Sequence, residues 1–128
     1  MSSITRGTSA RQVAAEGYDA AFHDLGEGWT VAFETFTADA DPAELFRGLP
    51  DDRCQCTHLG VVLEGRLILR YADREEVVEA GAAYLATPGH TPVVTAGTRT
   101  VEFSPTGALS TTMAVVGANL AALQGAAR

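Results

Sequence analysis

Short runs of alternating apolar and polar residues, separated by glycine-containing turns, dominate the centre of this chain. The richest run extends from Cys54 to Tyr71 and is broken only at Glu64-Gly65, where glycine permits a hairpin geometry that other residues resist. Shorter runs of the same kind occupy 18–25, 29–38, 75–78, 82–86, 92–96 and 100–103. About eight strands at this spacing predict an all-β sandwich or a small antiparallel barrel.

Two helices are expected beside these strands. Asp41, Pro42 and Gly48 predict a short helix near 42–48, in which Asp41 caps the free amides and Pro42 takes the first helical position. After Pro105, apolar residues recur every three or four positions, which predicts one amphipathic helix near 107–124 on the outside of the sheets. Residues 1–16 form an N-terminal extension with a weak helical pattern at 9–15. The expected organisation is therefore a single domain over 1–128, with a barrel at 18–104.

Charge and length exclude several classes of partner. The 128 residues suit one domain, and 46% of them are hydrophobic, which is enough for a core. Sixteen acidic residues against nine arginines give a net charge of -7, which argues against nucleic acid and anionic membrane surfaces. No secretory signal is present, and no segment approaches the roughly 20 apolar residues of a membrane span. We therefore expect a cytoplasmic protein.

Soft metal-ligating residues are concentrated between Cys54 and His58. Cys54 and Cys56 are too close for an unstrained disulfide, so they are free thiols or metal ligands. On a strand, the two cysteines and His58 share one face, but positions i and i+4 lie roughly 13 Å apart. All three can therefore bind one ion only where the strand coils sharply. The alternative is two buried core cysteines and a hydrogen-bonded histidine.

A second histidine, His90, lies in the tight turn 87–92, where prolines hold its imidazole in one orientation. Alone it is a weak indication of a site, and together with His58 it becomes a candidate ligand. His23 has no other ligand type near it in the sequence, so we interpret it as a surface residue or an outer neighbour of the site. Hydrolase-elbow, nucleotide and dinucleotide motifs are missing from the sequence.

The segment 61–67, with Ala80-Gly81 and Pro88-Gly89, resembles the two motifs of the cupin superfamily. The resemblance covers roughly 52–104, and with the C-terminal helix the chain is similar to small bacterial cupins. Counting back from Gly65 places His58 at the motif's glutamate, Cys54 at its second histidine and Asp52 at its first. Thr87 falls at the usual proline and Pro92 at the usual histidine, while His90 is two residues early. The resemblance implies a small antiparallel barrel or jelly roll with a metal inside.

Carried over position by position, the resemblance implies Cys54, His58 and His90 as metal ligands, with Asp52 and Cys56 as weaker candidates. Thiolate and imidazole favour one divalent transition-metal ion, namely Zn, Fe, Ni or Cu. Three protein ligands and an open position would let the ion act as a Lewis acid or activate water or dioxygen. The aromatic residues most able to line the mouth of the barrel are Trp29, Phe33, Phe36, Tyr71 and Tyr84.

The sequence thus predicts a small cytoplasmic metal-binding cupin that acts on a small organic molecule by oxygenation, isomerisation, cyclisation or decarboxylation. Two alternatives stay open: a non-catalytic ligand-binding cupin without metal, and a thiol-based redox sensor. Apolar residues on both faces of 59–69 exceed what one barrel interior needs, which predicts a homodimer that pairs its sheets.

Overall fold

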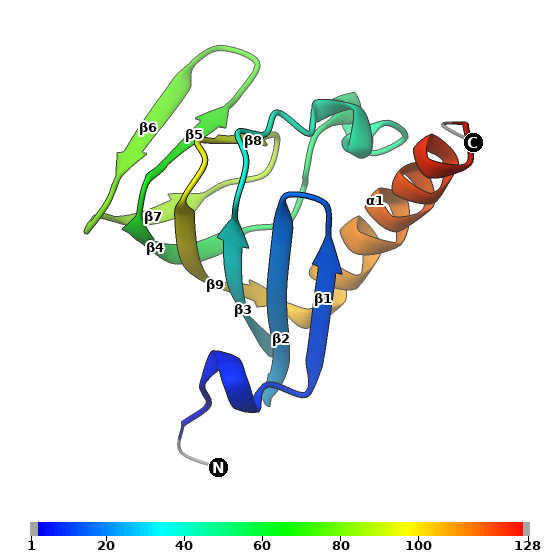
Figure 1. Ribbon diagram of the computed structural model, residues 1–128. Coiled ribbons are helices and arrows are strands. Elements are labelled where there is room, and N and C mark those ends of the chain that lie inside the picture. The colour runs from blue at the N-terminus through cyan, green and yellow to red at the C-terminus, as the bar shows by residue number, and fades with distance from the viewer. Residues whose placement is uncertain (1–2, 127–128) are drawn as a thin grey trace.

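The computed structural model describes residues 3–126, so the outermost positions of the expected domain lie outside the described residues. Within this range the chain forms strands, short 3-10 turns and a C-terminal helix (Figure 1). The strands are β1 (Arg11–Ala15), β2 (Tyr18–Gly26), β3 (Trp29–Phe36), β4 (His58–Glu64), β5 (Arg66–Arg70), β6 (Glu75–Glu79), β7 (Ala83–Ala86), β8 (Thr91–Val94) and β9 (Thr98–Pro105). The 3-10 turns are η1 (Arg6–Thr8), η2 (Ala43–Phe46) and η3 (Pro50–Asp52), and the helix is α1 (Thr106–Ala126).

All strand pairs are antiparallel, and they form two sheets. The six-stranded sheet has the order β1-β2-β3-β9-β4-β7, and the three-stranded sheet has the order β6-β5-β8. The chain passes from one sheet to the other at Gly65, whose φ of 79° is readily available only to glycine. A Cβ at Gly65 would lie 2.3 Å from Thr98 Oγ1. The expected all-β fold is confirmed, but the hairpin expected at this glycine is wrong. Strand β4 pairs with β7 and β9 in one sheet and β5 pairs with β6 and β8 in the other, so the turn at Gly65 joins two sheets instead of two paired strands.

Two clusters of buried residues fill the space inside the sheets. One lies between the sheets, where residues of β4 and β7 pack against residues of β5, β6 and β8: Val62, Tyr84, Ala86, Leu67, Leu69, Val78 and Val94, with Tyr71. The other lies under the helix, where Ala20, Phe22 and Ala32 of β2 and β3 contact Phe46, Leu49, Cys54, Cys56 and Leu109. The segment from η2 to Cys56 and the first turns of α1 thus cover one end of the fold.

Two local expectations differ from the structure. The segment 9–15 was expected to be weakly helical, but Arg11–Ala15 is the edge strand β1, whose backbone pairs with β2. Pairing with a neighbour outweighs a weak local preference, because a short isolated helix is marginal in water. The helix expected at 42–48 is a single 3-10 turn, η2. Asp41 does not cap it, since its carboxylate forms an ion pair with Arg70 at 2.8 Å.

Helix α1 is longer than expected and has no charged residue. Leu109 packs into the core and Leu123 is 45% exposed, so its apolar residues are not confined to one buried stripe, as in an amphipathic helix. Asn119 Nδ2 fastens the helix to η2 by donating to the Leu45 and Arg47 carbonyls, both at 2.8 Å. By length and mean hydropathy (1.3), Thr106–Gly125 meets the requirement for a membrane span, and 6% of this stretch is buried. This differs from the sequence-based expectation, although composition alone is weak evidence for a membrane.

The outward face of the six-stranded sheet is apolar. Alternate residues of β4, β7 and β9 point away from the interior, and several large ones are exposed: Leu59 (47%), Val61 (36%), Leu63 (46%), Leu85 (51%) and Phe103 (37%). Trp29 and Phe33 lie on the same face, because Phe33 pairs with Val101 and Val31 pairs with Phe103. We call this set of residues the outer apolar face.

Candidate metal centre

An irregular segment before β4 brings Cys54 and His58 close together. The regular strand begins only at His58, and Cys54 forms an isolated antiparallel bridge with His90 instead. The Cys54 N–H donates to the His90 carbonyl and the Gly89 N–H donates to the Cys54 carbonyl, both at 2.8 Å. The chain therefore bends between Cys54 and His58. This bend removes the separation of roughly 13 Å that an extended strand would impose between them.

The side chains of Cys54, His58 and His90 converge in the interior. One ligand atom from each lies within 4.8 Å of the other two, and all three residues are buried. Cys54 Sγ is 3.5 Å from His58 Nε2, and the two imidazole rings are 5.2 Å apart between centroids. In a tetrahedral zinc site, ligand atoms lie roughly 3.3–3.6 Å from one another. Small side-chain movements would therefore let these three groups bind one ion.

Hydrogen bonds on the far side of each ring direct a nitrogen toward this cluster. His90 Nδ1 lies 2.6 Å from the Thr87 carbonyl, so it carries the proton and leaves a lone pair on Nε2. His58 Nδ1 lies 2.6 Å from Ser104 Oγ and 3.7 Å from Glu102 Oε2. Protein metal sites commonly hold their histidine ligands in this way, with the second nitrogen bound to a carbonyl or carboxylate.

Burial also sets the charge of these groups. It lowers the pKa of His58 to about 4 and that of His90 to about 4, so both imidazoles are neutral at pH 7 and can bind a metal. Burial raises the pKa of the Cys54 thiol, and it raises that of Cys56 to about 12. A free thiolate is therefore disfavoured at both positions. A metal ion at the cluster would reverse this preference at Cys54 by binding the thiolate.

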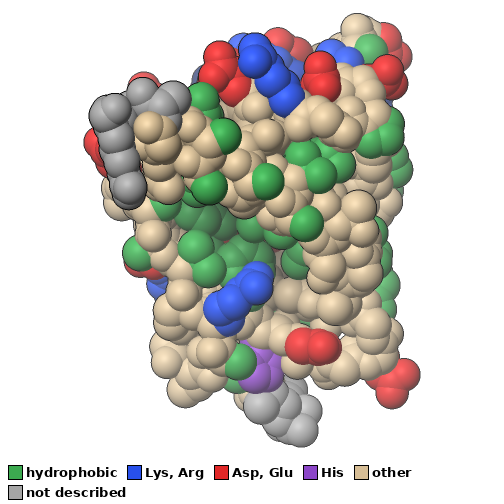
Figure 2. All heavy atoms as spheres, turned by 90° about the vertical axis from the view of Figure 1, so that its right-hand side faces the viewer, with side chains coloured by type: hydrophobic (Ala, Val, Ile, Leu, Met, Phe, Trp, Pro, Cys, Tyr) green, Lys and Arg blue, Asp and Glu red, His purple; other side chains and the backbone are tan. Residues whose placement is uncertain are grey.

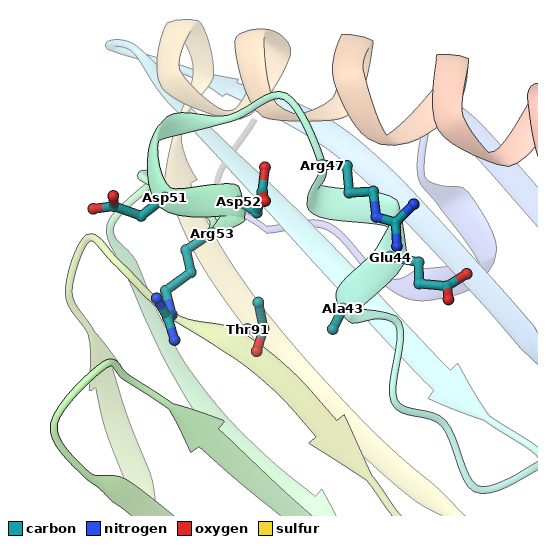
Figure 3. A pocket seen from close by; sticks show the side chains of 7 residues that line it. All are labelled: Ala43, Glu44, Arg47, Asp51, Asp52, Arg53 and Thr91. Atoms are coloured by element: carbon teal, nitrogen blue, oxygen red, sulfur yellow. The ribbon is translucent and has the colours of Figure 1, made fainter.

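The weaker ligand candidates lie elsewhere. Asp52 is exposed, and its carboxylate accepts a hydrogen bond from Gly48 N at 3.0 Å. Figure 3 shows Asp52 in the wall of a surface hollow of about 290 Å³. Cys56 is buried in the core cluster beneath α1, outside the Cys54, His58 and His90 group. His23 lies on β2, where its Nδ1 accepts a hydrogen bond from Ala10 N just before β1.

The expected pocket aromatics divide between the two faces of the sheet. Tyr71, Tyr84 and Phe36 face the interior, where Tyr71 packs edge-on against His90 with 6.1 Å between ring centroids. Trp29 and Phe33 belong to the outer apolar face. A second hollow, of about 480 Å³, lies between the first hairpin and α1, and Figure 2 shows apolar side chains at its floor. Neither hollow is lined by the three clustered residues.

Two acidic residues that the sequence analysis did not single out lie beside the cluster. Glu34 and Glu102 occupy inward positions of β3 and β9, and both are partly accessible. Burial, together with repulsion from Glu102, raises the pKa of Glu34 to about 7, and burial raises that of Glu102 to about 7. The sequence did contain an indication of them. Every second residue of a strand points inward, and in β3 and β9 the residues at the other inward positions are uncharged, so a single glutamate among them stands out.

No protein-family model and no curated protein matches the sequence. The fold, in contrast, is similar to solved structures. A protein of unknown function from Rhizobium leguminosarum superposes with a TM-score of 0.58 at 13% identity, over 81% of this chain and 95% of that one. An RmlC-like cupin from Shewanella frigidimarina superposes with a TM-score of 0.52 at 15% identity, over 77% of this chain and 86% of that one.

A third similar structure is that of apo-HppE, with a TM-score of 0.51 at 14% identity. The match covers 73% of this chain and 52% of HppE, so this chain spans about half of that protein. At these identities the similarity establishes architecture alone. The protein therefore has a cupin fold, as the motif resemblance predicted, and its interior contains a candidate metal site of one cysteine and two histidines.

Proposed function

We propose that this protein is a metal-binding cupin that acts on a small organic molecule through one transition-metal ion held by Cys54, His58 and His90. The observation that carries the proposal is the convergence of three buried ligand atoms, one thiol and two imidazoles, within 4.8 Å of one another. Soft and borderline ions such as Zn, Fe, Ni or Cu suit this set of donors better than Mg or Ca.

Three protein ligands support a catalytic rather than a closed structural site. When bound, such an ion supplies Lewis-acid activation of a molecule at its remaining coordination position. The chain's own contribution is orientation: the Thr87 carbonyl holds the ring of His90, and Ser104 holds the ring of His58. The bridge between Cys54 and His90 keeps two of the ligands in register, although they come from distant parts of the chain.

Metal content tests the proposal directly. We expect purified protein to retain about one equivalent of a transition metal and the variants Cys54→Ser, His58→Ala and His90→Ala to lose most of it, because each removes a ligand. Cys56→Ser is the matched control, since Cys56 is a buried thiol outside the cluster. Elemental analysis reads the result, and an anomalous-scattering map would locate the ion. Equal metal in all five proteins would remove the proposal.

Burial of the thiols weighs against the redox-sensor alternative. Cys54 is 2% exposed and Cys56 is 1% exposed, whereas sensor thiols are accessible and have a lowered pKa. Slow alkylation of both thiols in the folded protein is therefore expected. If the purified protein binds no metal, the remaining alternative is a ligand-binding cupin without metal.

We further propose that two copies pair through the outer apolar face and that the protein works in the cytoplasm. Exposed large apolar residues gathered on one sheet face are typical of an interaction surface. A second copy offers a surface of matching chemistry, and a self-complementary patch forms a closed dimer. The two free thiols suit a reducing compartment.

A further inference from the structure

The hollow of about 480 Å³ between the first hairpin and α1, which we call the second hollow, lies apart from the candidate metal cluster (Figure 2). Its volume falls within the roughly 300–1,000 Å³ that small-molecule sites occupy in proteins. One wall is formed by β1 and β2, where Arg11 lies opposite Phe22. The other wall is α1, which contributes Leu109, Met113 and Ala114. Phe22 and Leu109 belong to one buried cluster, so the two walls are packed against each other.

The floor of the second hollow is apolar. Phe22 and Leu109 line it together with the half-buried side chain of Met113. Methionine is unbranched and flexible, so its side chain adapts to the shape of an apolar group placed beside it. Removing apolar surface from water is favourable by roughly 25 cal/mol per Å², so a hydrocarbon body seated on this floor would be stabilised.

One arginine stands over this floor without an acidic partner. Arg11 Cζ lies 4.8 Å from the centroid of the Phe22 ring, a cation–π contact that leaves the N–H donors of the guanidinium group free. Within residues 3–126, Arg11 takes part in no ion pair and its guanidinium group donates no hydrogen bond. Arg6, in contrast, pairs with Asp19 at 2.6 Å. Arg11 therefore offers the second hollow a positive charge and several unused donors.

The charges around the second hollow favour a ligand with a single carboxylate. A carboxylate accepts two parallel N–H groups from one guanidinium group, so Arg11 alone can hold it. Asp24 also lines the hollow, and its Oδ1 accepts a hydrogen bond from Gly26 N at 2.8 Å. His23 adds no positive charge, because its Nδ1 accepts the Ala10 N–H and is therefore unprotonated. A dianion such as a phosphate monoester would keep an unbalanced charge beside Asp24.

We propose that the second hollow is a separate ligand site, and that its ligand is a small amphipathic carboxylate. The carboxylate accepts two N–H groups of Arg11, and the hydrocarbon body lies on the floor formed by Phe22, Leu109 and Met113. The inference is independent of the proposed function, because no residue of the metal cluster lines this hollow. An alcohol of the same length keeps the hydrocarbon body without the charge, and an alkylammonium ion carries a charge of the wrong sign.

The test follows the side-chain methyl group of Met113 by NMR, in full-length protein labelled with methyl-13C methionine. The chain has two methionines, so the variant Met113→Leu identifies the signal. Sodium hexanoate is the probe, and 1-hexanol and hexylammonium chloride are comparisons of the same chain length. We expect a saturable shift with hexanoate in the millimolar range. Binding of 1-hexanol should be about tenfold weaker, because the charge-assisted hydrogen bonds are lost, and binding of hexylammonium weaker still.

Three variants distinguish a built site from non-specific uptake of an apolar molecule. Arg11→Gln removes the charge, so hexanoate should bind about tenfold more weakly while 1-hexanol binds as before. Arg47→Gln is the matched control, since Arg47 is an exposed arginine that lines the other hollow, and it should leave the titration unchanged. Ala114→Phe places a ring in the second hollow from the exposed surface of α1 and should abolish binding of both molecules.

Three outcomes would overturn the inference. The first is an equal response of the Met113 signal to hexanoate and to 1-hexanol, or no response to either. The second is a hexanoate response that Arg11→Gln leaves unchanged, as for a carboxylate bound at the metal centre instead. The third is a Met113 signal that moves when the protein alone is diluted, because a second copy of the chain then occupies the hollow.

Discussion

Four titratable side chains that point into the interior set how the stability of the metal-free protein responds to pH between about 4 and 7. The pKa values of Glu34 and Glu102 rise from 4.5 to about 7 on folding, so between these values the folded state binds more protons and stability falls as pH rises. The pKa values of His58 and His90 fall from 6.5 to about 4, so between these values the unfolded state binds more protons and stability rises with pH. The two effects oppose each other.

The substitution Glu34→Gln should unbalance this opposition. The amide oxygen can still accept the Tyr18 hydroxyl, but no charge is buried when pH exceeds about 7. We expect the variant to be more stable than the natural protein at pH 8 by on the order of 1–3 kcal/mol. The advantage should shrink toward zero near pH 4, where both proteins carry an uncharged group. Urea unfolding of metal-free protein at several pH values measures this, and a variant less stable at pH 8 would contradict it.

Strand β4 and the turn after it depend on two glycines for different reasons. Gly60 has ordinary strand geometry and leaves space for the ring of Tyr84, whereas Gly65 has a positive φ and no space for a Cβ. At Gly65 the nearest atoms belong to Thr98, whose Oγ1 also accepts a hydrogen bond from Arg66 N at 3.0 Å. The turn between the sheets is therefore tied to the start of β9.

This arrangement predicts different costs for alanine at two glycines of similar backbone conformation. Gly81 has a φ of 89° and nothing within 4 Å of its missing Cβ, so Gly81→Ala should cost roughly 1 kcal/mol from backbone strain alone. Gly65→Ala adds a steric clash with Thr98 and should cost about 3 kcal/mol or more. Urea unfolding compares the two. Equal losses would mean that the turn relaxes without disturbing β9.

The molecule as a whole presents one large apolar surface. The outer apolar face lies on the side of the sheet away from Glu34, Glu102 and the candidate metal centre, so association there leaves the interior site intact. The exposed residues belong to neighbouring strands, since Leu59 lies opposite both Leu85 and Phe103. Contiguity of this kind distinguishes an interface from scattered surface leucines.

A charge placed on this face should therefore dissociate the protein. We expect a dimer at micromolar concentration by light scattering and a monomer for Leu59→Glu, because burying an unpaired carboxylate in an apolar interface is costly. Val77→Glu is the matched control, since Val77 is 55% exposed on the other sheet and should remain dimeric. A natural protein that is monomeric at this concentration would refute the dimer.

Much of the architecture could be predicted from local patterns. The alternation of apolar and polar residues predicted strands, and Gly65 predicted a turn, because side-chain period and positive φ are properties of a few neighbouring residues. That the strands on either side of Gly65 would join different sheets, and so form no hairpin, was not visible locally. Local patterns failed at 9–15 and 42–48, where pairing with β2 and the ion pair of Asp41 with Arg70 outweighed weak helical signals. The sequence of α1 contains no charged residue, yet the spacing of its apolar residues predicted an amphipathic helix.

The composition of the interior depended on contacts between distant segments. The cysteine and histidine residue types indicated a metal site, but the proximity of Cys54 to His58 required the bend that the bridge to His90 accompanies. Glu34 and Glu102 meet only because β3 pairs with β9 in one register. Residue type and local spacing specify which chemistry is available, whereas long-range pairing specifies which groups share a space, because a shift of one residue would turn each side chain to the opposite face.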